Sequence, residues 1–305
     1  MQMKDPCGFI IHPTWIAPVR PTNRVLRDHC LAIQNDLIVD LLPAEKSQSK
    51  YPEWPVQTLD QHILVPGLIN THGHAAMSLL RGYADDLELM DWLNNHIWPV
   101  ENRLMSYEYV YDGTALAIAE MMSTGTTCAA DTYFFPDAMA KAYKDHHFRA
   151  QICLPVIQFP NAWASTEAEH IEKAIAIHHE LAKNDLITTA FAPHAPYTVT
   201  DQGFKDILSS AQELGIPIHL HLHETQDEVQ SALDETGIRP IERLHKLGLI
   251  NNLLQAVHMT QLTQSEISLL AKNGVQIAHC PDSNLKLASG FCPVSELRDA
   301  NINVS

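Results

Sequence analysis

The chain has 305 residues, of which 46% are hydrophobic and 18% are charged, a composition typical of a globular protein with a sizeable core. Its 20 basic and 36 acidic residues give a net charge of −16, which disfavours a nucleic-acid partner because such a surface repels phosphates. The six cysteines form no C-x-x-C pair, and no apolar run approaches the roughly 18 residues that span a bilayer. We therefore expect reduced thiols, no membrane partner and a cytoplasmic location.

The first part of the chain, residues 1–62, contains short apolar runs separated by recurring prolines. Within residues 32–40, two such runs flank Asn35-Asp36, a pattern typical of a β-hairpin. We interpret this part as the amino-terminal portion of a small β-sandwich domain.

From residue 63 onward, apolar runs alternate with amphipathic helical stretches, which predicts a parallel sheet. Helix starts are indicated by residues that can cap a first turn: Ser106, Thr166 with Glu169, and Thr263 with Glu266. Helix ends are indicated by glycines that favour a left-handed conformation: Gly125, Gly215 and Gly274. Seven runs are predicted as strands, namely residues 64–74, 126–134, 148–159, 187–196, 216–224, 253–260 and 275–284, and an eighth is expected to begin at 302–305. We therefore predict an α/β fold, a (β/α)8 TIM-type barrel over residues 63–305 with seven full βα units and an incomplete eighth.

Histidines concentrate at the carboxyl ends of these predicted strands, where barrel enzymes place their chemistry. In His72-Gly73-His74, two imidazoles lie two residues apart on a strand and point to the same side. Neutral imidazole is a good ligand for zinc or iron, so this pair is a candidate metal site.

A second group of histidines, His219, His221 and His223, shares one face of the fifth predicted strand. These three cannot all bind one ion, because residues two apart on a strand are separated by roughly 6.6 Å. The residues alone leave open which of them is the ligand. Glu224 follows them at the strand end and is not part of a zincin H-E-x-x-H motif.

Two later strands also end in histidine. His258 ends the sixth predicted strand, and either a metal-site role or that of a buried core histidine fits it equally well. His279 takes the same position on the next strand, at the start of a polar segment, residues 279–287.

Taken together, residues 66–74, 221–225, 257–260 and 279–287 resemble the amidohydrolase superfamily, in particular the branch of 5-methylthioadenosine/S-adenosylhomocysteine deaminases and triazine or ammeline chlorohydrolases. The resemblance runs from about residue 8 to residue 305. It implies a hydrolase acting on carbon–nitrogen bonds that are not peptide bonds, with a nucleoside-like small molecule as substrate. It also implies one divalent metal ion, zinc with iron and manganese as alternatives, and a tendency to form homo-oligomers.

The resemblance also implies roles for individual residues. The metal ligands would be His72, His74 and His221. Glu224 would carry a proton to the ring nitrogen, and His258 would lie beside the attacking water. The other residues expected to contact the substrate are Trp92, Glu101, His194 and His279, although Trp92 fits equally well as a core aromatic residue.

Three departures from the family pattern stand out. The aspartate that ends strand eight in the family, its last metal ligand and general base, has no counterpart up to Ser305. The strands that would complete the small β-sandwich are also missing, so we expect a chain truncated relative to the family. Residues 152–164 contain no arginine of the kind that holds the homocysteine group in some relatives, which favours methylthioadenosine over S-adenosylhomocysteine.

The predicted reaction is hydrolytic deamination of an adenosine-type nucleoside, with release of ammonia. Two alternatives remain: a triazine- or guanine-type aminohydrolase or chlorohydrolase on the same fold, and an inactive truncated fragment.

Overall fold

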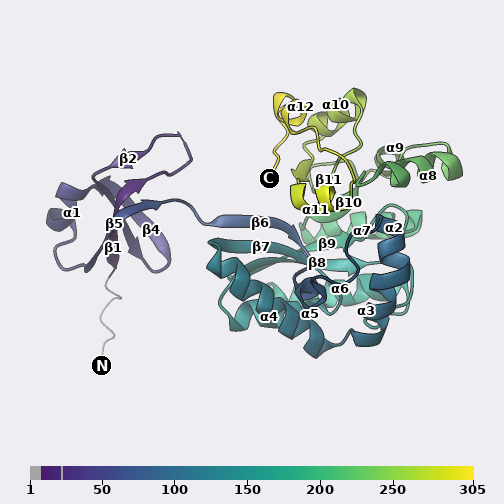
Figure 1. The fold of residues 1–305 in the computed structure, drawn as a ribbon, viewed down its shortest axis with the longest axis horizontal. Helices are drawn as coiled ribbons and strands as arrows, with labels where there is room; N and C mark the ends of the chain where they lie inside the picture. Colours follow the sequence, from purple (N-terminus) through teal and green to yellow (C-terminus); the bar gives the residue numbers. More distant parts are fainter. Residues whose placement is uncertain (1–7, 22) are drawn as a thin grey trace. The chain divides into compact units, whose positions relative to one another are not determined.

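The computed structural model describes residues 8–21 and 23–305, and the chain divides into two compact units between Gly67 and Leu68. The smaller unit is a five-stranded sheet in the order β2-β1-β3-β4, with β5 paired to β1 (Figure 1). Its elements are β1 (Phe9–Ile16), β2 (Leu26–Arg27), β3 (His29–Gln34), β4 (Leu37–Pro43), α1 (Ala44–Lys50) and β5 (Val56–Leu64).

The predicted hairpin is confirmed as β3 and β4, which pair antiparallel. Asn35 and Asp36 both have positive φ angles, 50° and 64°, as a two-residue turn that matches the strand twist requires. The small unit has its own core, formed by Ile10, Cys30, Ala32 and Leu42, with Tyr51 and Trp54 packed against it.

The larger unit contains a parallel sheet of seven strands in the order β12-β11-β10-β9-β8-β7-β6. The strands are β6 (Leu68–Gly73), β7 (Thr126–Thr132), β8 (Arg149–Val156), β9 (Ile187–Pro193), β10 (Ile218–Leu222), β11 (Leu254–His258) and β12 (Gln276–Ala278). Each strand pairs with its neighbour in sequence, and Val304 forms a further parallel bridge to Ile277. The predicted TIM-type barrel is therefore confirmed with seven strands, and the isolated bridge at Val304 falls within residues 302–305, where the eighth was expected to begin.

Helices follow the strands in alternation (Figure 1). They are η1 (Ala75–Leu80), α2 (Leu89–Asp91), η2 (Trp92–Ile97), α3 (Trp98–Leu104), α4 (Tyr107–Ser123), α5 (Pro136–Asp145), α6 (Glu167–Leu181), α7 (Asp201–Leu214), α8 (Gln226–Thr236), α9 (Pro240–Lys246), α10 (Gln264–Lys272), α11 (Pro281–Lys286) and α12 (Val294–Asp299). Within the described residues, none of these helices has the length and apolar character needed to cross a membrane.

The predicted helix starts at Ser106, Thr166 and Thr263 are confirmed, but only one of the two predicted capping boxes is complete. Thr263 and Glu266 form a complete capping box, in which each side chain accepts from the other residue's backbone N–H. Thr166 accepts from the Glu169 N–H, but the Glu169 carboxylate accepts from Ser165 instead of Thr166, so that box is half formed.

The prediction of a seventh strand over residues 275–284 was wrong in its second half. The strand ends at Ala278, and residues from Pro281 onward form helix α11. Pro281 explains the switch, because its fixed φ angle and missing N–H suit the first turn of a helix. The polar segment after His279 is consequently a helix at the mouth of the barrel.

Candidate metal centre and active site

The His72-Gly73-His74 segment lies where β6 ends and the short helix η1 begins. Asp131 on the neighbouring strand β7 secures this turn, accepting hydrogen bonds from the Ala75 N–H at 2.8 Å and from the Tyr143 hydroxyl at 3.1 Å. Burial raises the pKa of Asp131 to about 6. Sequence reasoning missed Asp131, because its partners Ala75 and Tyr143 come from separate elements.

The barrel mouth brings the strand-end histidines together. The Nε2 atoms of His72 and His221 are 3.1 Å apart, and one nitrogen each of His72, His221 and His258 lies within 4.8 Å of the other two. The His74 ring is centred 4.8 Å from that of His72 and 5.3 Å from that of His221. Nitrogens of three imidazoles from three strands, those of His72, His221 and His258, thus converge, and the ring of His74 lies beside them.

Hydrogen bonds at Nδ1 fix which nitrogen is free in three of these rings. The Nδ1 of His74 faces the Thr132 carbonyl at 2.7 Å, and that of His221 faces the His194 carbonyl at 2.6 Å. The Nδ1 of His258 faces the Asn284 side-chain oxygen at 2.8 Å. Because these oxygens can only accept, each Nδ1 carries the proton, and each Nε2 is left with a lone pair.

Burial keeps these rings neutral. Desolvation, reinforced by the neighbouring imidazoles, lowers the pKa of His72 and of His221 well below the ordinary value of 6.5. Burial likewise lowers the pKa of His258 to about 4. Neutral imidazoles with lone pairs directed at one point are the donor set that zinc prefers, so the residues present fit a divalent metal ion.

Glu224 lies beside this cluster, with Oε1 at 3.4 Å from the Nε2 of His258. Burial, and secondarily the nearby Glu228, raises the pKa of Glu224 to about 8. At neutral pH the carboxyl group therefore holds a proton, which is the state that a general acid requires.

Glu228, at the start of α8, shapes the segment that carries Glu224. Its two carboxylate oxygens accept from the backbone N–H groups of His223 at 3.0 Å and of Glu224 at 2.7 Å. Burial raises the pKa of Glu228 to about 7. Sequence reasoning missed this residue, although an acid four positions after a strand-end glutamate, in the first turn of a helix, could have indicated it.

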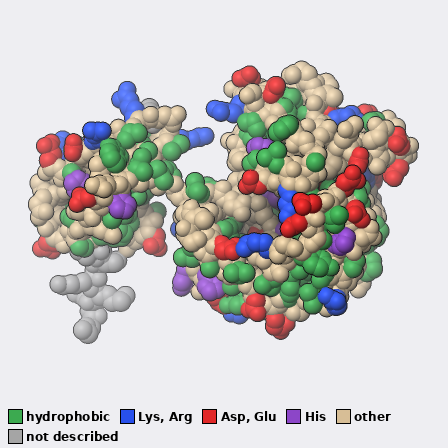
Figure 2. Space-filling model, viewed as in Figure 1, with side chains coloured by type: hydrophobic (Ala, Val, Ile, Leu, Met, Phe, Trp, Pro, Cys, Tyr) green, Lys and Arg blue, Asp and Glu red, His purple; other side chains and the backbone are tan. Residues whose placement is uncertain are grey.

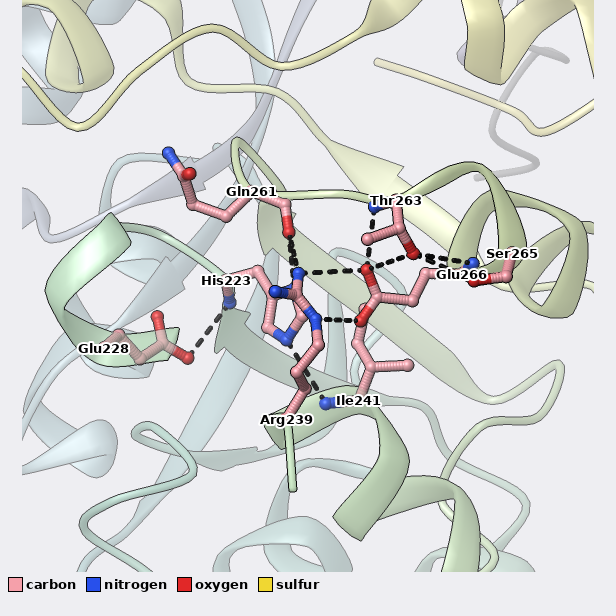
Figure 3. A network of polar contacts seen from close by, with 8 residues as sticks. All are labelled: His223, Glu228, Arg239, Ile241, Gln261, Thr263, Ser265 and Glu266. Carbon is pink, nitrogen blue, oxygen red and sulfur yellow. Dashed lines mark hydrogen bonds and ion pairs between the residues drawn. The ribbon is translucent and has the colours of Figure 1, made fainter. Parts of the chain in front are cut away.

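His223 does not share the face of His219 and His221, contrary to the prediction. β10 ends at Leu222, and His223 takes a positive φ angle of 51°, which turns its ring away from the cluster. The ring instead donates from Nδ1 to the Gln261 carbonyl at 2.9 Å and accepts the Ile241 N–H at 3.3 Å (Figure 3).

The network around His223 ties the loop after β11 to two helices. Arg239 donates to both carboxylate oxygens of Glu266, at 2.7 and 3.0 Å, and to the Gln261 carbonyl at 2.6 Å (Figure 3). His223 is therefore a structural residue that fixes the end of β10.

Two cavities adjoin the histidine cluster, and both are lined by His74, Trp92, Leu93, His194 and His221. Glu101 lines the first, and Glu224, His258 and His279 line the second. All the residues predicted to contact the substrate thus line one or both of these two neighbouring cavities, and Trp92 lines both instead of being enclosed in the core.

Glu101 is buried on α3 and accepts a hydrogen bond of 2.6 Å from the Tyr133 hydroxyl. Burial raises the pKa of Glu101 to about 7. His279 has a buried Nδ1 atom with no hydrogen-bond partner among the described residues, and its side chain lines the second cavity.

The surface outside the site agrees with the acidic composition. On the face shown in Figure 2, Lys and Arg side chains are scattered among acidic ones and form no continuous basic patch.

A parallel barrel with buried imidazoles and a protonated carboxyl group at its mouth defines a metal-dependent hydrolase. The amidohydrolase family model matches residues 63–305, and the chain belongs to this family. The expected enzyme class, a hydrolase of carbon–nitrogen bonds, is thereby confirmed.

Proteins that are similar to this chain in sequence or structure include several deaminases of adenine nucleosides. The chain is 46% identical, over 99% of its own length and 68% of the relative's, to a 5-methylthioadenosine/S-adenosylhomocysteine deaminase of Saccharophagus degradans. It is 36% identical, over 92% of its length and 65% of the relative's, to a 5'-deoxyadenosine deaminase of Methanopyrus kandleri. It is also similar to the crystal structure of an adenosine deaminase from Xanthomonas campestris with bound zinc, with a TM-score of 0.95 and 48% identity over 99% of this chain and 69% of that one.

Proposed function

We propose that this site hydrolytically deaminates adenine nucleosides that carry an uncharged 5′ group, with 5-methylthioadenosine as the representative substrate. The observation that carries the proposal is the convergence of nitrogens of His72, His221 and His258 beside the buried Glu224 carboxyl group, whose pKa is raised to about 8. The names of the relatives support the same chemistry.

We propose His72, His74 and His221 as the ligands of one divalent ion, zinc by analogy with the adenosine deaminase structure. When bound, the ion would supply Lewis-acid activation of a water molecule.

The remaining steps belong to the side chains. His258, whose Nε2 lone pair faces the cluster, accepts a hydrogen bond from the attacking water and orients it. Glu224 transfers its proton to the purine ring nitrogen next to the carbon under attack. The carboxylate then takes a proton from the added water and passes it to the amino group, which leaves as ammonia. Atoms balance: one water enters, and a hydroxypurine and one ammonia leave.

Substrate contacts follow from the cavity lining. Trp92 offers a flat apolar surface against which a purine can stack, and the Glu101 carboxyl group can accept from sugar hydroxyls. His194 and His279 supply further polar atoms at the edge of this space.

A third cavity adjoins the first and favours an uncharged 5′ group. It shares Trp98, Glu101, Phe134 and Ile157 with the first cavity and continues to Phe159 and Pro160. Neither Lys nor Arg is among the described residues that line it. An amino-acid carboxylate would lose its hydration there without a cation in return, whereas a methylthio group would gain apolar contacts.

The test is ultraviolet spectroscopy of the zinc-loaded protein with 5-methylthioadenosine, following conversion of the aminopurine to a hydroxypurine. We expect turnover, weaker turnover of S-adenosylhomocysteine, and a loss of about 100-fold or more in kcat for Glu224→Gln. A folded, zinc-loaded protein that hydrolyses no aminopurine would refute the proposal, and hydrolysis of triazines or guanine instead would reassign the substrate class.

A further inference from the structure

His72 differs from the other three histidines of the cluster in the partner of its Nδ1 atom. His74, His221 and His258 each face an oxygen that can only accept. His72 instead faces the Nε2 atom of another imidazole, His219, at 2.8 Å. A neutral imidazole nitrogen can donate or accept, so this contact alone does not decide which His72 nitrogen carries the proton.

With the side-chain amide of Gln255 in the observed orientation, the next contact in the chain favours one proton order. The Nδ1 atom of His219 lies 3.1 Å from the side-chain oxygen of Gln255. An amide oxygen accepts, so His219 is protonated at Nδ1, its Nε2 accepts from the Nδ1–H of His72, and the Nε2 of His72 is left free.

The opposite proton order would block metal binding. If a donor stood in the place of the Gln255 oxygen, His219 would donate from Nε2 to His72. The His72 proton would then lie on Nε2, directed at the Nε2 of His221 only 3.1 Å away. That proton would occupy the direction in which His72 has to offer its lone pair.

The fold holds this relay in place. His219 on β10 and Gln255 on β11 are partners in the parallel register, so their side chains leave the sheet side by side. The side chain of His219 is 2% exposed, so the protein surrounds this contact on all sides. Gln255 is half-buried and lines a separate cavity with Asn70, Gln151 and Gln276.

We propose that Gln255 is a positioning residue for the metal centre: through His219 it selects the tautomer of His72 that can bind the ion. This inference rests on the proposed ligand set, because it assigns a cause to the free Nε2 atom of His72. Gln255 itself lines neither of the two cavities beside the histidine cluster.

The experiment compares zinc affinity, measured by competition with a chromophoric chelator, in the wild-type chain, Gln255→Met and Gln255→Glu. Methionine is similar in length to glutamine but has no strong hydrogen-bonding group. We expect the zinc affinity of Gln255→Met to fall by about 10- to 100-fold, as it does when other hydrogen-bond partners of metal-binding histidines are replaced. An ionised glutamate can only accept at this position and therefore keeps the acceptor that Gln255 offers to His219, so we expect affinity within about threefold of wild type.

Two further variants distinguish a failure of the role proposed for Gln255 from a failure of the proposed ligand set. Gln276→Met changes the neighbouring glutamine on β12, whose side chain bonds the Gly274 carbonyl, and should leave zinc affinity unchanged. His72→Ala tests the ligand itself and should weaken zinc binding more than any glutamine variant.

The inference is overturned if Gln255→Met binds zinc within about threefold of wild type, or if Gln255→Glu is weakened as much as Gln255→Met. If either result occurs while His72→Ala still weakens zinc binding, the proposed ligand set stands and only the role of Gln255 is refuted. Unchanged zinc binding in His72→Ala would refute both the proposed ligand set and the role of Gln255.

Discussion

At the scale of single residues, the role of a histidine in this protein depends on the partner of each ring nitrogen more than on the residue type. His221 and His223 are two residues apart and both buried, yet their partners differ. The Nδ1 of His221 is tied to a carbonyl and its Nε2 enters the cluster, whereas both ring nitrogens of His223 are used by backbone groups.

This contrast predicts different outcomes for the two alanine variants. His221→Ala should lose zinc affinity by at least about 100-fold, since it removes a ligand. His223→Ala should keep zinc but lose about 1–3 kcal/mol of stability, because two buried backbone groups lose their partner. Zinc content by elemental analysis and urea unfolding would check both, with the exposed His245→Ala as control. Retained zinc in His221→Ala would contradict its role as a ligand.

Glu101 predicts a pH dependence of stability. Its pKa rises from 4.5 to about 7 because the side chain is buried, so between these values the folded state binds a proton that the unfolded state has lost. The corresponding stabilisation is full below pH 4.5 and is lost as the pH rises through 7.

Comparison of wild type with Glu101→Gln isolates this effect. The free energy of unfolding of the wild type should fall relative to that of the variant as the pH rises, by up to about 3 kcal/mol. Urea unfolding at several pH values would measure it. Parallel pH profiles of the two proteins would show that Glu101 titrates normally in the folded state.

At the scale of elements, the junction between β10 and α8 sets the position of the proton donor. Thr225 caps α8, and the carboxylate of Glu228 in the first turn holds the N–H groups of His223 and Glu224. One helix start thus fixes the strand end that precedes it.

Replacing Glu228 tests this junction. Glu228→Gln replaces one accepting oxygen with an amide NH2 group, which can only donate, so one of the two backbone N–H groups loses its partner and Glu224 shifts. We expect kcat to fall by about 10- to 100-fold while zinc content stays constant, as for a misplaced acid catalyst. Glu235→Gln, an exposed change on the same helix, should be neutral. Equal kcat values for Glu228→Gln and Glu235→Gln would contradict a positioning role for Glu228.

At the scale of the whole molecule, the proposed metal site and the neighbouring His258 lie on strands that are distant from one another in the barrel sheet. β6 contributes His72, and β10 and β11 contribute His221 and His258. An ion bound between these elements stabilises the folded barrel, because the unfolded chain does not present the same ligands together.

Zinc should therefore raise the thermal midpoint of the larger unit. At 100 times its dissociation constant, a ligand specific to the folded state adds about 2.7 kcal/mol. Differential scanning calorimetry with zinc and with a chelator would measure the shift, which should be absent in a His72→Ala, His221→Ala double variant. A shift of the same size in the double variant would place the stabilising ion elsewhere.

The sequence by itself determined the barrel and the location of its chemistry. Strand and helix periodicity are local properties, and parallel strands bring their carboxyl ends to one edge, so His72, His74, His194, His221 and His258 could be placed before any coordinates. The isolated bridge at Val304 falls where the same alternation predicted the start of the eighth strand.

Only the tertiary structure decided what each group does at that edge. The turn of His223 away from the cluster depends on a backbone angle at one residue, and helix α11 replaces part of a predicted strand. The Nδ1 partner of His72 lies 147 residues away, on a strand four places along the sheet. Proton positions depend on such distant partners and on burial, neither of which has a local signal in the sequence, so the tautomers and the protonated state of Glu224 emerge only once the strands are assembled.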